Sequence, residues 1–129
     1  MIRELTLTAE PIERARCATA LLGSGDVGAV VTFWGVVRGT EAGAPIGALE
    51  YEAFGRMAEH QFGLVFRQID QRWPIHSIRV VHRVGVVRVN EPSLWVEVAA
   101  AHRAEAFAAC QFLIEEMKRM VPIWKRPIP

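Results

Sequence analysis

The chain has 129 residues, of which 51% are hydrophobic and 22% are charged, and its formal net charge is +1. This length and balance predict a single folded domain over residues 1–129 and exclude a disordered or fibrous protein. A nearly neutral chain gives no reason to expect a nucleic-acid partner, and its longest apolar runs fall short of the roughly 20 residues that a membrane-spanning helix requires.

The first half of the chain predicts a strand, a helix and two further strands. Ile2–Thr8 alternates as a short strand, and Pro11–Leu22 has proline in its first turn and a glycine stop, as is typical of a helix. Gly28–Val37 is β-branched and aromatic with almost no polar alternation, so we expect a strand buried on both faces. The glycine-rich segment Gly39–Gly47 predicts a loop, and the alternation of Ala48–Phe54 predicts a half-exposed strand.

The second half predicts two long helices with strands between them. Apolar residues at helical spacing predict a helix over Arg56–Trp73 and another from about His102 to Met120. Three β-rich segments lie between them and predict an antiparallel meander: Ser77–His82, Val84–Val89 and Leu94–Ala99. The apolar stripe expected on the last helix consists of Ala106, Phe107, Cys110, Leu113, Ile114 and Met117. This order predicts an α+β domain with three helices.

The two cysteines, Cys17 and Cys110, fall in helix-like segments among alanines and leucines, where a small apolar side chain serves packing. We therefore expect no disulfide. Two thiols and four scattered histidines form no cluster at metal-ligand spacing, so the sequence predicts neither a metal nor another cofactor. The N-terminus lacks the basic flank and apolar core of a secretory signal, which predicts a cytoplasmic protein.

The two lysines stand out against thirteen arginines. Where only positive charge is needed this chain uses arginine, so Lys118 and Lys125 indicate positions where an amine is wanted, because an ammonium can lose its proton and guanidinium cannot. We expect Lys118 beside the apolar stripe of the last helix, with its amine at the edge of the stripe. The alternative is two ordinary surface lysines whose charges stay in water.

Three further cations are candidates for binding an anion. His102 and Arg103 open the last helix, where exposed backbone N–H groups already favour an anion. Arg38 follows the apolar strand at the start of the glycine-rich loop, a position from which a side chain can reach a cleft. The alternatives are salt bridges within the domain, to Glu105 or Glu97 for the helix residues and to Glu50 or Glu52 for Arg38.

The spacing of these residues constrains a shared site. Arg103 and Lys118 are separated by about 22 Å of helix at roughly 1.5 Å per residue, too far for one small substrate to touch both. If both belong to one active site, the arrangement that satisfies this distance is two protomers that each contribute one end of the helix. The apolar strand and the four tryptophans also favour a covered subunit surface, although helices of the same chain could cover it.

Four stretches in this order resemble the molybdopterin synthase catalytic (large) subunit family, also called the MoaE family. They are Gly28–Arg38, Leu49–Ala53, Val81–Gly85, and the segment from His102 through Lys118 to the Val-Pro-Ile-Trp-Lys motif at Val121–Lys125. No single stretch is decisive, but together they cover nearly the whole chain.

The resemblance implies an α/β hammerhead-type fold with a mainly antiparallel sheet, and a homodimer that forms a heterotetramer with two copies of a small ubiquitin-like sulfur carrier. The carrier's C-terminal glycine thiocarboxylate would enter a pocket and deliver two sulfurs in turn to cyclic pyranopterin monophosphate (precursor Z), giving molybdopterin in molybdenum cofactor biosynthesis. By matching position, Lys118 and Lys125 would be catalytic, and Arg38, His102 and Arg103 would line the pocket for the anionic substrate.

Two rival functions use the same residues differently. A noncatalytic adaptor would bind the tail of a ubiquitin-like partner through the arginines, and it should tolerate Lys118→Arg because the charge persists. A small RNA-binding domain is the other rival, but the strands lack the interleaved aromatic and basic residues of a stacking platform. The enzyme subunit remains the prediction.

Overall fold

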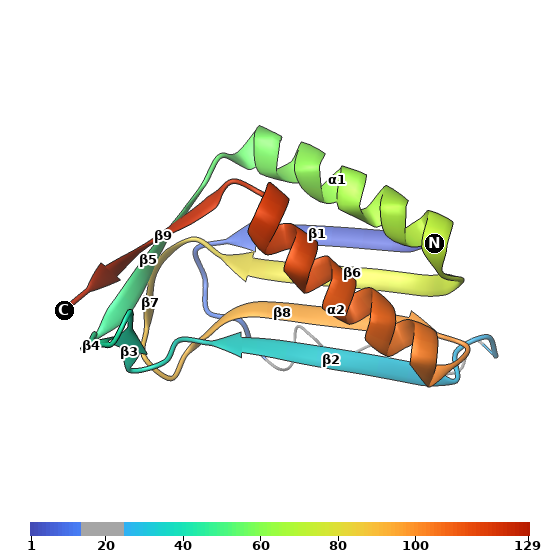
Figure 1. Ribbon diagram of the computed structural model, residues 1–129, viewed down its shortest axis with the longest axis horizontal. Helices are drawn as coiled ribbons and strands as arrows, with labels where there is room; N and C mark the ends of the chain where they lie inside the picture. Colours follow the sequence, from blue (N-terminus) through green and yellow to red (C-terminus); the bar gives the residue numbers. More distant parts are fainter. Residues whose placement is uncertain (14–24) are drawn as a thin grey trace.

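The computed structural model describes residues 1–13 and 25–129, which form strands and two long helices (Figure 1). The elements are β1 (Ile2–Thr8), β2 (Ala29–Val36), β3 (Thr40–Glu41), β4 (Ala44–Pro45), β5 (Ala48–Ala53), α1 (Gly55–Arg72), β6 (Ile75–Arg83), β7 (Gly85–Arg88), β8 (Pro92–Ala100), α2 (Arg103–Met120) and β9 (Ile123–Ile128). The α+β class is confirmed.

A four-stranded sheet in the order β1-β6-β8-β2 forms the larger layer, and α1 and α2 cover one of its faces (Figure 1). β1 runs parallel to β6, and the other neighbours pair antiparallel. Side chains alternate along a strand, so every second residue of β6 and β8 points toward the helices. Ile78, Val96, Val98 and Leu113 are completely buried between the layers.

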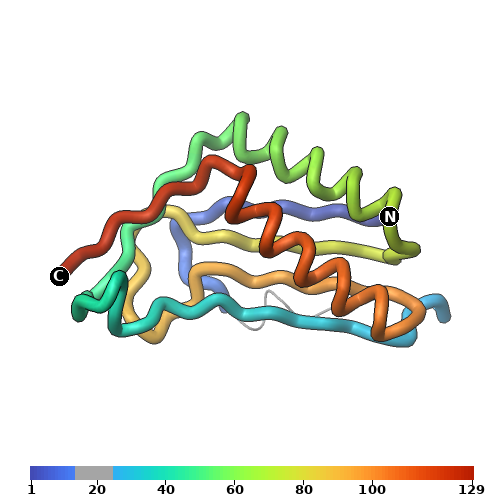
Figure 2. Tube along the Cα trace, in the orientation of Figure 1, coloured from blue at the N-terminus to red at the C-terminus, as the bar shows by residue number. Residues whose placement is uncertain are grey.

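A three-stranded sheet in the order β7-β5-β9 lies at one end of the larger sheet, beside the β3-β4 hairpin (Figure 2). Its strands pair antiparallel around β5. The strand β9 was not predicted, because Pro122 indicates only the end of the helix. Pro127 lies within β9, where a missing N–H is tolerated because β9 is an edge strand.

The predicted meander is wrong, since β6 and β8 belong to the larger sheet and β7 belongs to the smaller one. The chain leaves the larger sheet after Arg83, and Gly85 adopts a φ of +84°, which favours glycine. The buried Arg83 side chain braces this turn by donating to the Val86 carbonyl (3.3 Å) and by pairing with Glu91 (3.6 Å). Local β-propensity predicts these strands but does not predict which sheet each one joins.

The structure also corrects the predicted burial of β2 and of the last helix. β2 is an edge strand that pairs only with β8 within the described residues, and Phe33 and Val36 are 37% and 50% exposed. Its apolar composition therefore does not indicate burial on both faces. Phe107 is 61% exposed because α2 turns Ala106 and Ala109 inward instead.

Two expectations concern the part of the chain outside the described residues. Most of the predicted helix Pro11–Leu22 falls there, and residues 11–13 are not helical, so the described part contains two helices where three were predicted for the whole chain. Cys17 also falls there, whereas Cys110 is a buried free thiol. Neither α1 nor α2 is long and apolar enough to cross a membrane.

Two glycines are expected to respond to alanine with opposite signs. A Cβ at Gly28 would overlap the backbone carbonyl oxygen of Ala101, so Gly28→Ala should lower the free energy of unfolding by about 1–3 kcal/mol. Gly63 lies within α1 with open space around its Cα, so Gly63→Ala should raise it by up to about 1 kcal/mol through helix propensity. Urea unfolding midpoints check both, and equal destabilisation would contradict the packing at Gly28.

Candidate active site

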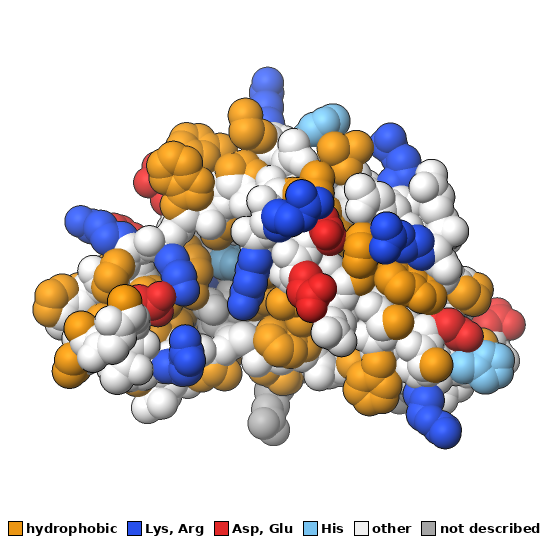
Figure 3. Space-filling model, viewed as in Figure 1, with side chains coloured by type: hydrophobic (Ala, Val, Ile, Leu, Met, Phe, Trp, Pro, Cys, Tyr) orange, Lys and Arg blue, Asp and Glu red, His pale blue; other side chains and the backbone are white. Residues whose placement is uncertain are grey.

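The largest hollow near the predicted residues is a cavity of about 680 Å³ between the end of β2, the inner face of the small sheet and the last turns of α2. Figure 3 shows basic side chains gathered around this hollow. Its polar lining consists of Arg38, Glu41, Tyr51, His82, Ser93, Lys118 and Lys125. A smaller hollow of about 140 Å³ is lined by other residues, among them Glu4, Arg79 and Trp95.

The fold brings three of the five predicted site residues to this cavity. Arg38 follows β2, Lys118 lies in the last turn of α2, and Lys125 lies on β9 opposite Tyr51 of β5. The helix C-terminus tolerates Lys118 because its partial negative charge favours a cation. Three cations from separate parts of the chain thus face one space, an arrangement suited to an anionic ligand.

Glu41 is a cavity residue that the sequence did not reveal. It lies in the β3-β4 hairpin, and its carboxylate accepts from the Lys125 ammonium at 2.9 Å. The hydrogen bond and charge of Lys125 lower the pKa of Glu41, with a smaller contribution from the charge of Arg38. Within the described residues Arg38 pairs with neither Glu50 nor Glu52, and Glu50 pairs instead with Arg126.

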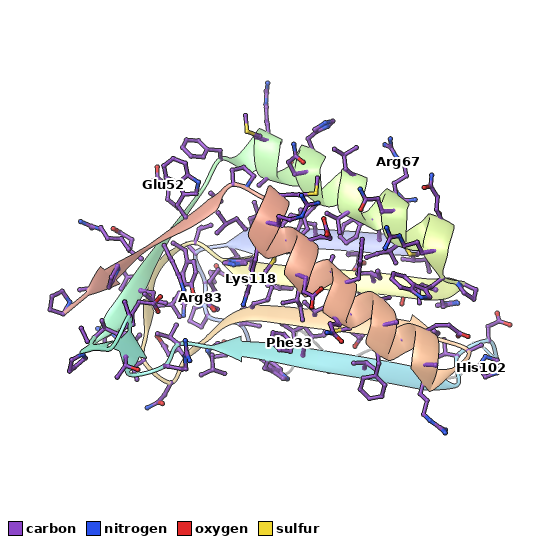
Figure 4. All side chains as sticks on the ribbon, in the orientation of Figure 1. Phe33, Glu52, Arg67, Arg83, His102 and Lys118 are labelled. Carbon is purple, nitrogen blue, oxygen red and sulfur yellow. The ribbon has the colours of Figure 1, made fainter. Side chains whose placement is uncertain are left out.

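Lys118 is exposed and points from α2 toward the cavity (Figure 4). It forms no ion pair within residues 1–13 and 25–129. Its neighbour Arg119 pairs instead with Glu116 at 2.6 Å. Of the two lysines, Lys118 therefore carries the amine that is free to meet a ligand, whereas the Lys125 amine is held by Glu41.

His102 and Arg103 lie at the other end of α2, away from Lys118 (Figure 4). His102 faces Glu105 at 3.7 Å, as one alternative anticipated, but Glu97 pairs with Arg79. The exposed Arg103 forms no ion pair within the described part of the chain. The N-cap residue His102 makes no side-chain capping hydrogen bond, so within the described residues the first N–H groups of α2 remain available to an anion.

The remaining polar cavity residues are uncharged groups that sequence reasoning missed. The Tyr51 hydroxyl donates to Ser93 Oγ (3.3 Å), and Ser93 lies within reach of the Gly35 carbonyl (3.5 Å). The rings of Tyr51 and His82 meet edge to face at 5.1 Å. No sequence signal marked Tyr51 or His82, because the strands β5 and β6 contain several other polar residues.

Burial lowers the pKa of His82 below its ordinary 6.5, although its hydrogen bond to the Arg83 carbonyl acts in the opposite direction. As the pH falls, the unfolded chain therefore binds a proton at His82 at a higher pH than the folded chain does. The stabilisation that neutral His82 contributes is fully present above pH 6.5 and is lost as the pH falls toward the folded-state pKa. His82→Gln should flatten this dependence in urea unfolding between about pH 7.5 and about pH 5.5. The exposed His60→Gln is the control, and an equal change in both variants would contradict the assignment.

The model of the MoaE protein family matches residues 7–120 of this chain. The chain belongs to the MoaE family. A relative from Thermoplasma volcanium, named Molybdopterin synthase catalytic subunit, is 43% identical over 103 residues, which are 80% of this chain and 75% of the relative. One of the same name from Cereibacter sphaeroides is 39% identical over 121 residues, which are 93% and 82% of the two chains. A crystal structure of molybdopterin synthase from Staphylococcus aureus is 32% identical with a TM-score of 0.80, covering 97% of this chain and 89% of the other.

Membership of the MoaE family confirms the resemblance found in the sequence, and the solved structure confirms the fold class. The common name of the MoaE relatives also confirms the expectation of an enzyme subunit that acts in molybdopterin formation. The matched range includes Arg38, His102, Arg103 and Lys118 and ends before Lys125. The roles of these five residues remain predictions.

Proposed function

We propose that this MoaE-family chain transfers sulfur from the thiocarboxylated C-terminus of a small ubiquitin-like carrier to cyclic pyranopterin monophosphate, twice, to form molybdopterin. The observation that carries the proposal is the convergence of Arg38 with both lysines of the chain on one cavity. A volume of about 680 Å³ lies within the range of about 300–1,000 Å³ that is usual for small-molecule sites.

Some cavity residues bind the substrate, and others take part in the chemical step. Arg38 holds the substrate phosphate and neutralises charge that develops during transfer. Lys118 acts on the thiocarboxylate as nucleophile or as general acid and base, because its amine has no ion-pair partner in the described part of the chain. Lys125, which Glu41 holds in place, supplies a fixed positive charge beside it.

A homodimer would complete the site with His102 and Arg103 of the partner. Within the described residues β2 is an edge strand that exposes Phe33 and Val36, and two such edges can pair antiparallel about a twofold axis. The N-terminal end of β2 lies beside the start of α2, because the Gly28 N–H donates to Ala100 (2.9 Å). Antiparallel pairing therefore brings the partner's α2 N-terminus to the end of β2 that adjoins the cavity.

The dimensions of the elements agree with this arrangement. β2 spans about 26 Å at roughly 3.3 Å per residue, close to the roughly 22 Å of helix between Arg103 and Lys118. The twofold axis then places the N-terminal end of each α2 beside the cavity of the other protomer. Two carriers on this dimer would give the heterotetramer.

We also propose that the chain works in the cytoplasm. The buried free thiol of Cys110 suits a reducing compartment. Cell fractionation with an antibody to the native protein checks this, and recovery from a secreted fraction would contradict it.

The test of the proposed function is conversion of the pterin precursor by the full chain together with a carrier that ends in a thiocarboxylate. Molybdopterin should form with this carrier and not with one that ends in an ordinary carboxylate. Carrier binding without any product would contradict the proposal and favour a noncatalytic adaptor.

A further inference from the structure

The floor of the cavity carries an uncharged group of side chains, Tyr51, His82 and Ser93, which we name the neutral strip. His82 is 5% exposed and Ser93 is 7% exposed, yet both line the cavity. A ligand group that reaches the strip must therefore be small enough to enter the floor of the cavity.

The hydrogen bonds of the neutral strip leave two acceptor atoms without a partner in the described part of the chain. The Nδ1–H group of neutral His82 donates to the Arg83 carbonyl at 2.6 Å, so Nε2 carries a lone pair. His82 has no second hydrogen bond within residues 1–13 and 25–129. The Tyr51 hydroxyl donates its proton to Ser93 Oγ, so its oxygen also keeps a lone pair that can accept a hydrogen bond. Burial lowers the pKa of His82, which favours this neutral form.

The neutral strip lies directly beside the cations. Tyr51 of β5 is the cross-strand partner of Lys125 of β9, and both side chains line the cavity. The site thus offers positive charge on one side and uncharged acceptors next to it. A ligand that satisfies both joins an anionic group to a neutral part that bears N–H donors.

We propose that the neutral strip recognises the N–H donors of the substrate's heterocyclic ring system, with His82 Nε2 and the Tyr51 oxygen as acceptors, while the cations hold the phosphate. Ser93 is a positioning residue that directs the Tyr51 proton away from the ligand. This inference rests on the proposed function, because it assigns the ring of that same substrate to a subsite. Backbone N–H groups of the carrier tail are the competing donors, but the tail must present its terminal acyl group to Lys118 while still joined to a folded body.

The experiment measures the affinity of the full chain for three probes: cyclic pyranopterin monophosphate, inorganic phosphate and the carrier with an unmodified C-terminus. Tyr51→Phe keeps the ring that packs on His82 and removes only the hydroxyl, and His82→Asn keeps a donor near the Arg83 carbonyl and removes Nε2. Each change should weaken binding of the pterin phosphate about three- to tenfold, the scale of one hydrogen bond. Affinities for inorganic phosphate and for the carrier should stay at the wild-type values.

His82→Gln is the matched control, because its side chain places a polar group near the position of Nε2 and should recover part of the lost affinity. Near-ultraviolet circular dichroism confirms that each variant is folded. Unchanged affinity for the pterin phosphate, or an equal loss for phosphate or carrier, would overturn the assignment of the strip. If the wild-type chain forms molybdopterin and the variants bind the pterin phosphate with wild-type affinity, only this inference is refuted. If the wild-type chain does not bind the pterin phosphate, the proposed function is refuted as well.

Discussion

Lys118→Arg should reduce conversion of the pterin precursor by at least about 100-fold, the contribution of one nucleophilic or acid–base group. Arginine keeps the positive charge and the reach of the side chain, but its guanidinium does not lose a proton at neutral pH. Lys125 cannot replace the lost amine, because Glu41 holds it at 2.9 Å. Single-turnover formation of molybdopterin with thiocarboxylated carrier measures the effect.

Two comparisons make this result specific to the amine. Carrier affinity of the Lys118→Arg variant should equal that of the wild type, since both side chains are cations. Arg119→Lys, at the next position on the solvent side of α2, should leave turnover unchanged. Wild-type turnover by Lys118→Arg would show that only charge is needed at this position.

Mixed dimers of Arg103→Ala and Lys118→Ala subunits should recover about one quarter of wild-type activity, although each variant alone is inactive. In a mixed dimer one site combines both intact residues and the other combines both altered ones. Random association places half of the subunits in such dimers, which leaves roughly a quarter of all sites complete. Co-expression with two different affinity tags and assay of the mixed population measures the recovery.

The control for this experiment pairs Lys118→Ala with Lys125→Ala. Both lysines line the cavity of the same protomer, so every site of a mixed dimer lacks one of them and no activity should return. If the Arg103 and Lys118 variants also fail to recover activity, then the sites are not shared between protomers. Recovery in the control pair would instead show that Lys125 acts in the partner's cavity.

The sequence alone predicted the local elements of the described part well. The periodicity that predicts a helix over Arg56–Trp73 matches α1, whose buried residues include Phe62, Val65 and Ile69. The last helix and the strands β1, β5 and β8 were also predicted. These elements were predictable because a period of 3.6 or 2 residues depends only on neighbouring positions.

The sequence also determined which side chains have unusual chemistry, since the contrast between two lysines and thirteen arginines is a property of composition. The length of the last helix predicted that Arg103 lies far from Lys118, but the sequence did not show that Arg38, Lys118 and Lys125 meet. That decision belongs to the tertiary structure, because the cavity forms only where β2, α2 and the small sheet converge.

The same limit explains the missed residues. Glu41 and His82 have no pattern that indicates a site, and they become cavity residues only when the β3-β4 hairpin and the end of β6 are placed beside Lys125 and Tyr51. Strand pairing between distant segments decides that placement, and the loss of chain entropy on pairing is offset by contacts that no local window contains. The sequence therefore determined the elements and the reactive groups, and the tertiary structure alone decided which of those groups share a site.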